Sequence, residues 1–212
     1  MLRATTRLTT VGAARRQYTT AFLHTLGRLQ PLAVLDVTQL ADVDAFLAHT
    51  EFDHVVVSAA QTPMGPVRTL PLDDAYAAMD SKFWVSYRVA RSVRIRDGGS
   101  LTLVSGFLSV RPGKNAVLQG AINAALEALG RGLALELSPV RVNTVSPGMI
   151  DTPIRAKMDS VARDKLYQDT ATRLPVKCVG LPEDIAHAVI YLASTAYASG
   201  STVLVGGGAA IA

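Results

Sequence analysis

The sequence predicts an α/β fold, a doubly wound parallel sheet with helices on both of its faces. From residue 32 onward, short apolar runs typical of buried strands alternate with longer amphipathic patterns typical of helices. No apolar run reaches the roughly 18–20 residues that a membrane-spanning helix needs. The chain has 212 residues, 49% of them hydrophobic, which suits one domain with a sizeable core.

The individual elements follow from these runs and from the turn residues between them. The predicted strands are residues 32–36, 53–57, 101–104, 140–145 and 202–205. The predicted helices are residues 39–50, 72–96, 115–137, 153–176 and 182–194. In the helix over 72–96, Asp73 and Asp74 fall in the first turn and Arg94 and Arg96 near the end, as the helix dipole favours, and Gly98-Gly99 ends it.

The charge distribution argues against a basic nucleic-acid-binding face. The formal net charge is +4, but residues 1–35 hold five arginines and no acid, so the remainder has 16 basic residues against all 17 acids. We therefore divide the chain into a basic N-terminal segment, 1–31, and a domain, 32–212. The single cysteine, Cys178, cannot form an internal disulfide, which favours a reducing compartment such as the cytoplasm. The four scattered histidines have no metal-ligand spacing, so no metal site is predicted.

Polar and small residues follow the predicted strands at their carboxyl ends, where open parallel sheets bind ligands. These residues are Asp36, Ser58–Ala60, Ser105 and Pro147–Thr152, and we expect them to line one crevice.

Several of these segments, in this order and spacing, resemble the short-chain dehydrogenase/reductase family over residues 32–208. Asp36-Val37-Thr38 looks like the family's aspartate turn beside the adenine, and the strand ending at Ala59-Ala60 is similar to the one that ends in its Asn-Asn-Ala-Gly motif. Leu103–Gly106 occupies the place of the catalytic-serine strand. Arg141–Gly148 with Asp151-Thr152-Pro153 is very similar to the nicotinamide loop.

The resemblance implies a Rossmann-like sheet that binds NADP or NAD. By position, the implied cofactor-binding residues are Gly12, Asp36, Val37, Ala59, Ala60, Pro147, Gly148, Ile150 and Thr152. It also implies a small organic carbonyl or alcohol as substrate. A homodimer or homotetramer formed through the helices over 72–96 and 115–137 is implied as well.

The family's catalytic residues are replaced in this sequence. Counting back from Ala124-Ala125, the lysine position is Asn123 and the tyrosine position is Gln119, whose amide neither gives nor takes a proton near neutral pH. The serine position is Gly106, with Ser105 adjacent, and the family's asparagine falls near Lys82.

We therefore take Lys82, Ser105, Gln119 and Asn123 as candidate catalytic residues, each with a structural alternative. Lys82 is either a solvated surface lysine or a cation facing the crevice with a lowered pKa. Ser105 is either a substrate ligand or a strand-end hydroxyl bonded to local backbone. Gln119 and Asn123 either contact substrate or hydrogen-bond each other across one helical turn. The spacing of Tyr76, Tyr87 and Tyr167 selects none of them as a replacement phenol.

The N-terminus allows three interpretations. Residues 7–12 form a strand that leads to the phosphate turn, with Gly12 its only glycine and Arg15 and Arg16 near the phosphates. Alternatively, Asp36-Val-Thr ends the family's third strand, and the first two strands are missing. In the third interpretation, residues 1–20, rich in Arg, Thr and Ala, are a mitochondrial targeting segment, which places the protein in the matrix.

The leading functional prediction is hydride transfer between NAD(P) and a small carbonyl or alcohol. Two alternatives stay open. One is an inactive homologue that binds a ligand or a partner subunit. The other is a non-redox isomerase or cyclase that uses the same crevice.

Overall fold

The computed structural model describes residues 8–11, 40–48 and 50–212. Its centre is a five-stranded parallel sheet in the order β1-β2-β3-β4-β5. The strands are β1 (Leu8–Val11), β2 (Glu51–Val57), β3 (Arg94–Val104), β4 (Arg141–Pro147) and β5 (Thr202–Val205). All five run in one direction, so their carboxyl ends lie along a single edge of the sheet.

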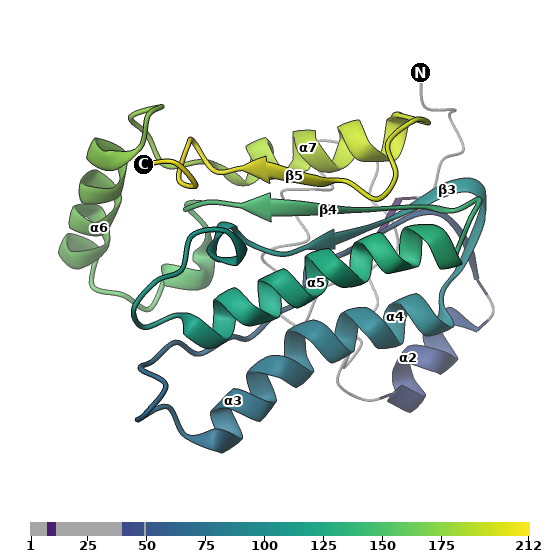
Figure 1. Cartoon of the computed structure of the whole chain (residues 1–212), viewed down its shortest axis with the longest axis horizontal. Coiled ribbons are helices and arrows are strands. Elements are labelled where there is room, and N and C mark those ends of the chain that lie inside the picture. Colours follow the sequence, from purple (N-terminus) through teal and green to yellow (C-terminus); the bar gives the residue numbers. More distant parts are fainter. Residues whose placement is uncertain (1–7, 12–39, 49) are drawn as a thin grey trace.

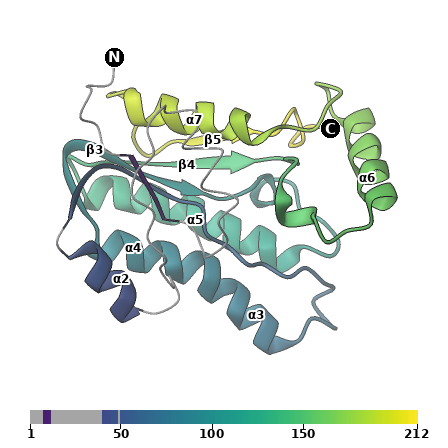
Figure 2. The same ribbon diagram turned by 180° about the vertical axis from the view of Figure 1, so that it is seen from behind.

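Helices cover both faces of this sheet, which confirms the predicted fold class (Figures 1 and 2). One face carries α2 (Leu40–Leu47), the helical run α3 (Leu72–Met79), η1 (Asp80–Trp84) and α4 (Val85–Ser92), and the long helix α5 (Val117–Glu136). The other face carries α7 (Pro182–Ser194). Two 3-10 turns, η2 (Phe107–Ser109) and η3 (Pro153–Arg155), and helix α6 (Ser160–Arg173) complete the described elements.

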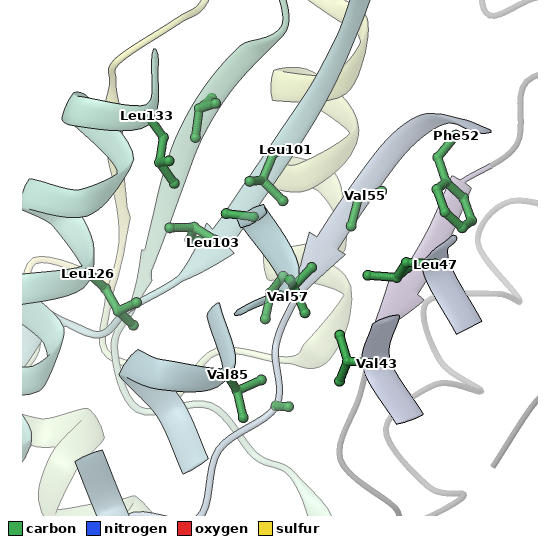
Figure 3. Close-up of a cluster of buried hydrophobic side chains, with 14 residues drawn as sticks. Val43, Leu47, Phe52, Val55, Val57, Val85, Leu101, Leu103, Leu126 and Leu133 are labelled. Carbon is green, nitrogen blue, oxygen red and sulfur yellow. The ribbon is translucent and has the colours of Figure 1, made fainter. Parts of the chain in front are cut away.

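The core follows the alternation of side chains along the strands. Val55 and Val57 of β2 pack with α4 and α5 on one face (Figure 3), whereas the intervening Val56 packs against α7 on the other. The larger cluster also contains Leu101 and Leu103 of β3, both fully buried. Burial on both faces explains why the central strands read as continuous apolar runs.

One predicted element is wrong at its end. The helix that begins at Leu72 stops at Ser92, and Arg94 and Arg96 lie in β3 rather than in a last helical turn. Arg96 donates to Glu51 and Asp53 of β2, at 3.2 and 3.1 Å. The glycines after it form a break in the β2–β3 register instead of a helix end, because Gly98 has φ +77° and a Cβ on Gly99 would lie 2.3 Å from the Asp53 carbonyl oxygen.

Two other predictions need correction: the strand predicted over 101–104 begins at Arg94, and the helix predicted over 153–176 is a 3-10 turn at Pro153–Arg155 followed by a separate helix at Ser160–Arg173. The other predicted helices and strands that fall on described residues are confirmed, with bounds that shift by a few residues. The predicted strand over 32–36 lies outside the described residues. A strand near residues 7–12 is confirmed as β1, which pairs with β2. The division of the chain at residue 31 stays a prediction. In the part of the chain that the structure describes, no helix is both long and apolar enough to cross a bilayer.

Candidate active site

Lys82 enters the protein interior from a π turn. The turn η1 joins α3 to α4, and its wider backbone spiral orients neighbouring side chains differently from an α-helix. Ser81 faces the loop after β2, where its hydroxyl accepts from the Gln61 amide and donates to the Gln61 carbonyl. Lys82 is buried, with only 7% of its surface exposed. The structure therefore favours a lysine inside the fold over a solvated one.

The Lys82 ammonium lies between two neutral oxygen acceptors. Its Nζ donates to the Ser105 carbonyl oxygen at 2.8 Å and to Asn123 Oδ1 at 2.6 Å. Removal from water disfavours the charged form and lowers the pKa of Lys82 to about 8, while the Glu127 carboxylate acts in the opposite direction. An amine with this pKa can hold or release a proton near neutral pH.

The hydroxyl group of Ser105 donates its proton in a hydrogen bond within the protein. It is buried just after β3, and its Oγ donates to Glu127 Oε1 at 2.9 Å. Ser109 donates to the same carboxylate oxygen at 2.6 Å. A hydroxyl has one proton to donate, so in this arrangement Ser105 is left with acceptor capacity toward a substrate. The Ser105 carbonyl oxygen accepts a hydrogen bond from Lys82, and the Ser105 hydroxyl donates one to Glu127.

Gln119 and Asn123 do not bond to each other. Gln119 Nε2 donates to Thr62 Oγ1 at 3.2 Å, and Asn123 Oδ1 accepts from Lys82. Gln119 Oε1 is buried without a hydrogen-bond partner among the described residues. A buried, unpaired amide oxygen carries a free-energy cost that a donor on a bound ligand relieves.

Asn123 and Gly106 are sterically coupled. A Cβ built on Gly106 lies 2.8 Å from Asn123 Nδ2, closer than real Cβ contacts allow. Asn123 is 1% exposed, so its amide has little room to retreat. The absence of a side chain at Gly106 therefore leaves the space in which Asn123 lies beside Lys82.

The predicted cofactor-binding residues that the structure describes cluster at the carboxyl edge of the sheet. Ala59 and Ala60 follow β2, and Pro147 ends β4. Gly148 approaches Gly206 so closely that a Cβ on it would lie 2.6 Å from the Gly206 Cα. The loop through Ile150 and Thr152 continues from there, with Ile150 bridged to Gly180. Gly12, Asp36 and Val37 lie outside the described residues.

Among the described residues, no hydrogen bond joins Tyr76, Tyr87 or Tyr167 to Lys82 or Gln119. Tyr76 and Tyr87 are exposed on the outer side of the first helical run. Tyr167 donates to Asp151 at 2.9 Å, and burial together with this carboxylate raises the pKa of its phenol. No group of three His, Cys, Asp or Glu side chains among the described residues could hold a metal ion.

The sequence interpretation missed Glu127, Thr62 and Ser109, which bind the candidate residues. Glu127 carried a usable signal: it lies four residues after Asn123 and is the one acid in the apolar run 116–130. A carboxylate on the packed face of a helix needs partners, here two serines. Thr62 and Ser109 lie in or beside loops and carried no comparable signal.

Comparison with known families supports the resemblance found in the sequence. Residues 4–210 match a family model described as enoyl-(acyl carrier protein) reductase. A short-chain dehydrogenase/reductase from Acremonium sp is 35% identical over 113 residues, which cover 53% of this chain and 43% of that protein. A Streptomyces violaceoruber protein that is named as a ketoacyl reductase of the granaticin polyketide synthase is 31% identical. The match covers 82% of this chain and 74% of that protein. The chain thus spans less than half of some curated relatives and about three quarters of another.

Solved structures share this architecture. A small-chain dehydrogenase in complex with NADPH has a TM-score of 0.88 and 32% identity, covering 98% of this chain and 100% of its own. An aldohexose dehydrogenase from Thermoplasma acidophilum in ligand-free form has a TM-score of 0.87 at 21% identity, covering 98% and 95% respectively. The second likeness concerns the fold alone.

Proposed function

The chain belongs to the short-chain dehydrogenase/reductase family, and from this premise we propose that it transfers hydride between NAD(P) and a small carbonyl compound or alcohol. The observation that carries the proposal is the buried Lys82 amine, whose pKa of about 8 suits proton transfer at neutral pH. It lies beside Ser105, at the carboxyl end of β3, where an open parallel sheet binds its ligand.

The residues at this edge fit the nicotinamide half of a dinucleotide. Ala59 and Ala60 have small side chains, so a flat ring can approach the backbone that follows β2, whereas the small size of Gly148 is needed for its close packing against Gly206. A bound nicotinamide supplies or accepts the hydride. A solved relative with 32% identity holds NADPH, which supports the same class of cofactor here. We expect Gly12, Asp36 and Val37 to serve the adenosine and phosphate half.

In this proposal Lys82 replaces the family's tyrosine as the group that handles the proton. An ammonium has three N–H donors, and Ser105 and Asn123 take two of them. The third donates to the substrate oxygen, so the proton passes to that oxygen as the carbonyl becomes an alcohol. In the opposite direction the neutral amine takes up the proton of the alcohol.

The other residues bind and orient. Asn123 and Ser105 fix the position of the amine, since the two acceptors restrict where its third N–H points. Gln119 Oε1, buried without a partner, accepts from a donor on the bound substrate or cofactor. The amide nitrogen of Gln119 donates to the Thr62 hydroxyl, which fixes the orientation of the side chain.

The first test is a titration of the purified protein with NADPH and NADH, followed by thermal unfolding. Binding at about 100 times the dissociation constant adds about 2.7 kcal/mol of stability. A carbonyl screen at neutral pH then compares the wild-type protein with Lys82→Met, which we expect to bind cofactor but to reduce carbonyls at least about a hundredfold more slowly.

Each outcome of this test separates the proposal from its alternatives. No binding of either dinucleotide favours the inactive homologue. Turnover of a substrate without any nicotinamide favours the isomerase or cyclase. Equal turnover by wild-type protein and Lys82→Met contradicts the role of the lysine.

We further propose that the chain forms a homodimer or homotetramer through α4 and α5. Trp84 and Tyr87, 45% exposed each, stack edge to face with ring centroids 5.8 Å apart on the outer surface of the first helical run. Aromatic side chains of this kind are enriched at protein interfaces. Light scattering of the wild-type protein and of Tyr87→Glu tests this, and a monomeric wild-type protein contradicts it.

A further inference from the structure

We propose that the Lys82 amine also captures small, uncharged aldehydes and ketones covalently, as an imine. This activity shares Lys82 with the proposed function but needs no nucleotide. It would make the site a carbonyl-binding centre whether or not hydride transfer follows.

The hydrogen bonds of Lys82 match a neutral amine. A neutral –NH2 group has two N–H donors and one lone pair, and the structure offers Nζ two acceptors, the Ser105 carbonyl and Asn123 Oδ1. Among the described residues, no third acceptor bonds to Nζ. With both donors engaged, the lone pair is left pointing away from them, as attack on a carbonyl carbon requires.

The surroundings increase the share of this neutral form, and burial sets Lys82 apart from the other lysines. The chain has five lysines, and the other four are exposed. Burial lowers the pKa of Lys82 to about 8, so roughly a tenth of it is unprotonated at pH 7. A solvated lysine with an ordinary pKa is unprotonated at that pH in less than about one molecule in a thousand.

The chemistry balances without an oxidant or a reductant. Nζ attacks the carbonyl carbon, the C–N bond forms, and the carbonyl π electrons move to oxygen. The two hydrogens of the amine leave with that oxygen as water, and a C=N bond remains. Protonation of the imine restores one N–H, which keeps a hydrogen bond to Ser105 or Asn123.

The environment also selects the class of carbonyl compound. Glu127 interacts electrostatically with Lys82 and places a negative charge near the amine. Anionic oxo acids are therefore disfavoured. With Lys82 only 7% exposed, small molecules reach it more readily than bulky ones.

The experiment traps the imine by reduction. Full-length protein, free of nucleotide, is treated briefly at pH 7 with acetaldehyde and sodium cyanoborohydride, and modification of each of the five lysines is quantified by peptide mass spectrometry. We expect Lys82 to be alkylated at least about tenfold faster than Lys114, Lys157, Lys165 or Lys177, because burial lowers the pKa of Lys82 to about 8. Pyruvate in place of acetaldehyde should label Lys82 more slowly.

Two variants serve as matched controls. Lys82→Arg keeps a hydrogen-bonding cation without a nucleophilic amine and should lose the fast-labelled peptide, whereas Lys114→Arg should leave it unchanged. Labelling of Lys82 no faster than of the exposed lysines overturns the proposal, and mapping on the wild-type protein decides this even if Lys82→Arg fails to fold. A dinucleotide titration on the same preparation keeps the two proposals distinct, since fast labelling without NADPH binding supports imine formation alone.

Discussion

The buried lysine makes stability rise with pH in a range where most proteins lose it. Burial lowers the pKa of Lys82 from 10.5 to about 8. Between these two values the unfolded chain carries a proton on Lys82 that the folded chain has released. The state that holds more protons is favoured as pH falls, so the contribution of Lys82 opposes folding at neutral pH and disappears as pH rises through 10.5.

The magnitude follows from these two values. From pH 7 to about pH 9.5, the contribution of Lys82 to the free energy of unfolding should increase by about 2 kcal/mol. Other groups titrate in the same range, so the informative quantity is the difference between wild-type protein and Lys82→Gln. Glutamine keeps a donor for Asn123 and cannot carry the charge.

Urea unfolding of both proteins at several pH values measures this difference. We expect the wild-type protein to gain about 2 kcal/mol relative to Lys82→Gln across the range. The matched control is Lys114→Gln, an exposed lysine whose difference from wild-type protein should stay constant. If the difference between wild-type protein and Lys82→Gln is also flat with pH, the lysine has an ordinary pKa, and the reasoning that makes it an acid or a nucleophile fails.

Three further predictions concern contacts around and behind the site. Gly106→Ala should cost about 1–3 kcal/mol by urea unfolding, because its Cβ meets Asn123 Nδ2 at 2.8 Å, and should cost clearly less in an Asn123→Ala background. Exchanging the pair as Lys82→Asn with Asn123→Lys should preserve a hydrogen bond, so a coupling energy near zero between the two changes contradicts their direct contact. Arg141→Met should cost about 3 kcal/mol, because the buried guanidinium donates to the carbonyls of Leu192 and Ala193 at 2.6 and 2.8 Å. Retained stability there contradicts its role in holding the end of α7.

The fold could be predicted wherever hydrophobic period and turn chemistry agree. The helix over 182–194 and the strand over 202–205 have the predicted bounds, because Pro182 fixes the first turn and an apolar run is bounded by polar and glycine residues. The predicted end of the helix that begins at Leu72 was wrong, because the residues near it fit two different structures. Arg94 and Arg96 suit a helix C-terminus, but Val93 and Ile95 alternate with them, and pairing with β2 favours the strand.

The sequence pointed to candidate site residues but did not predict their hydrogen-bond partners. The resemblance predicted that Lys82, Ser105, Gln119 and Asn123 lie near one another, and the structure joins Lys82 to Ser105 and Asn123 by hydrogen bonds. The resemblance could not predict the hydrogen-bond partners of these residues. A π turn changes which side chains face inward, whereas sequence periodicity assumes a regular α-helix. The bond from Lys82 to Asn123 and the one from Ser105 to Glu127 join residues 41 and 22 positions apart.

The departures from the family pattern fit together as one arrangement. By the sequence resemblance, Lys82 falls near the position of the family's asparagine and Asn123 at that of its lysine, and the structure joins these two residues by a hydrogen bond. Gly106 leaves the space that Asn123 fills. Burying a lysine without an ion pair costs folding free energy, here about 3 kcal/mol at neutral pH from the shift in its pKa. A methionine at position 82 would avoid this cost, so packing alone gives no reason for the amine, whereas proton transfer or carbonyl binding does.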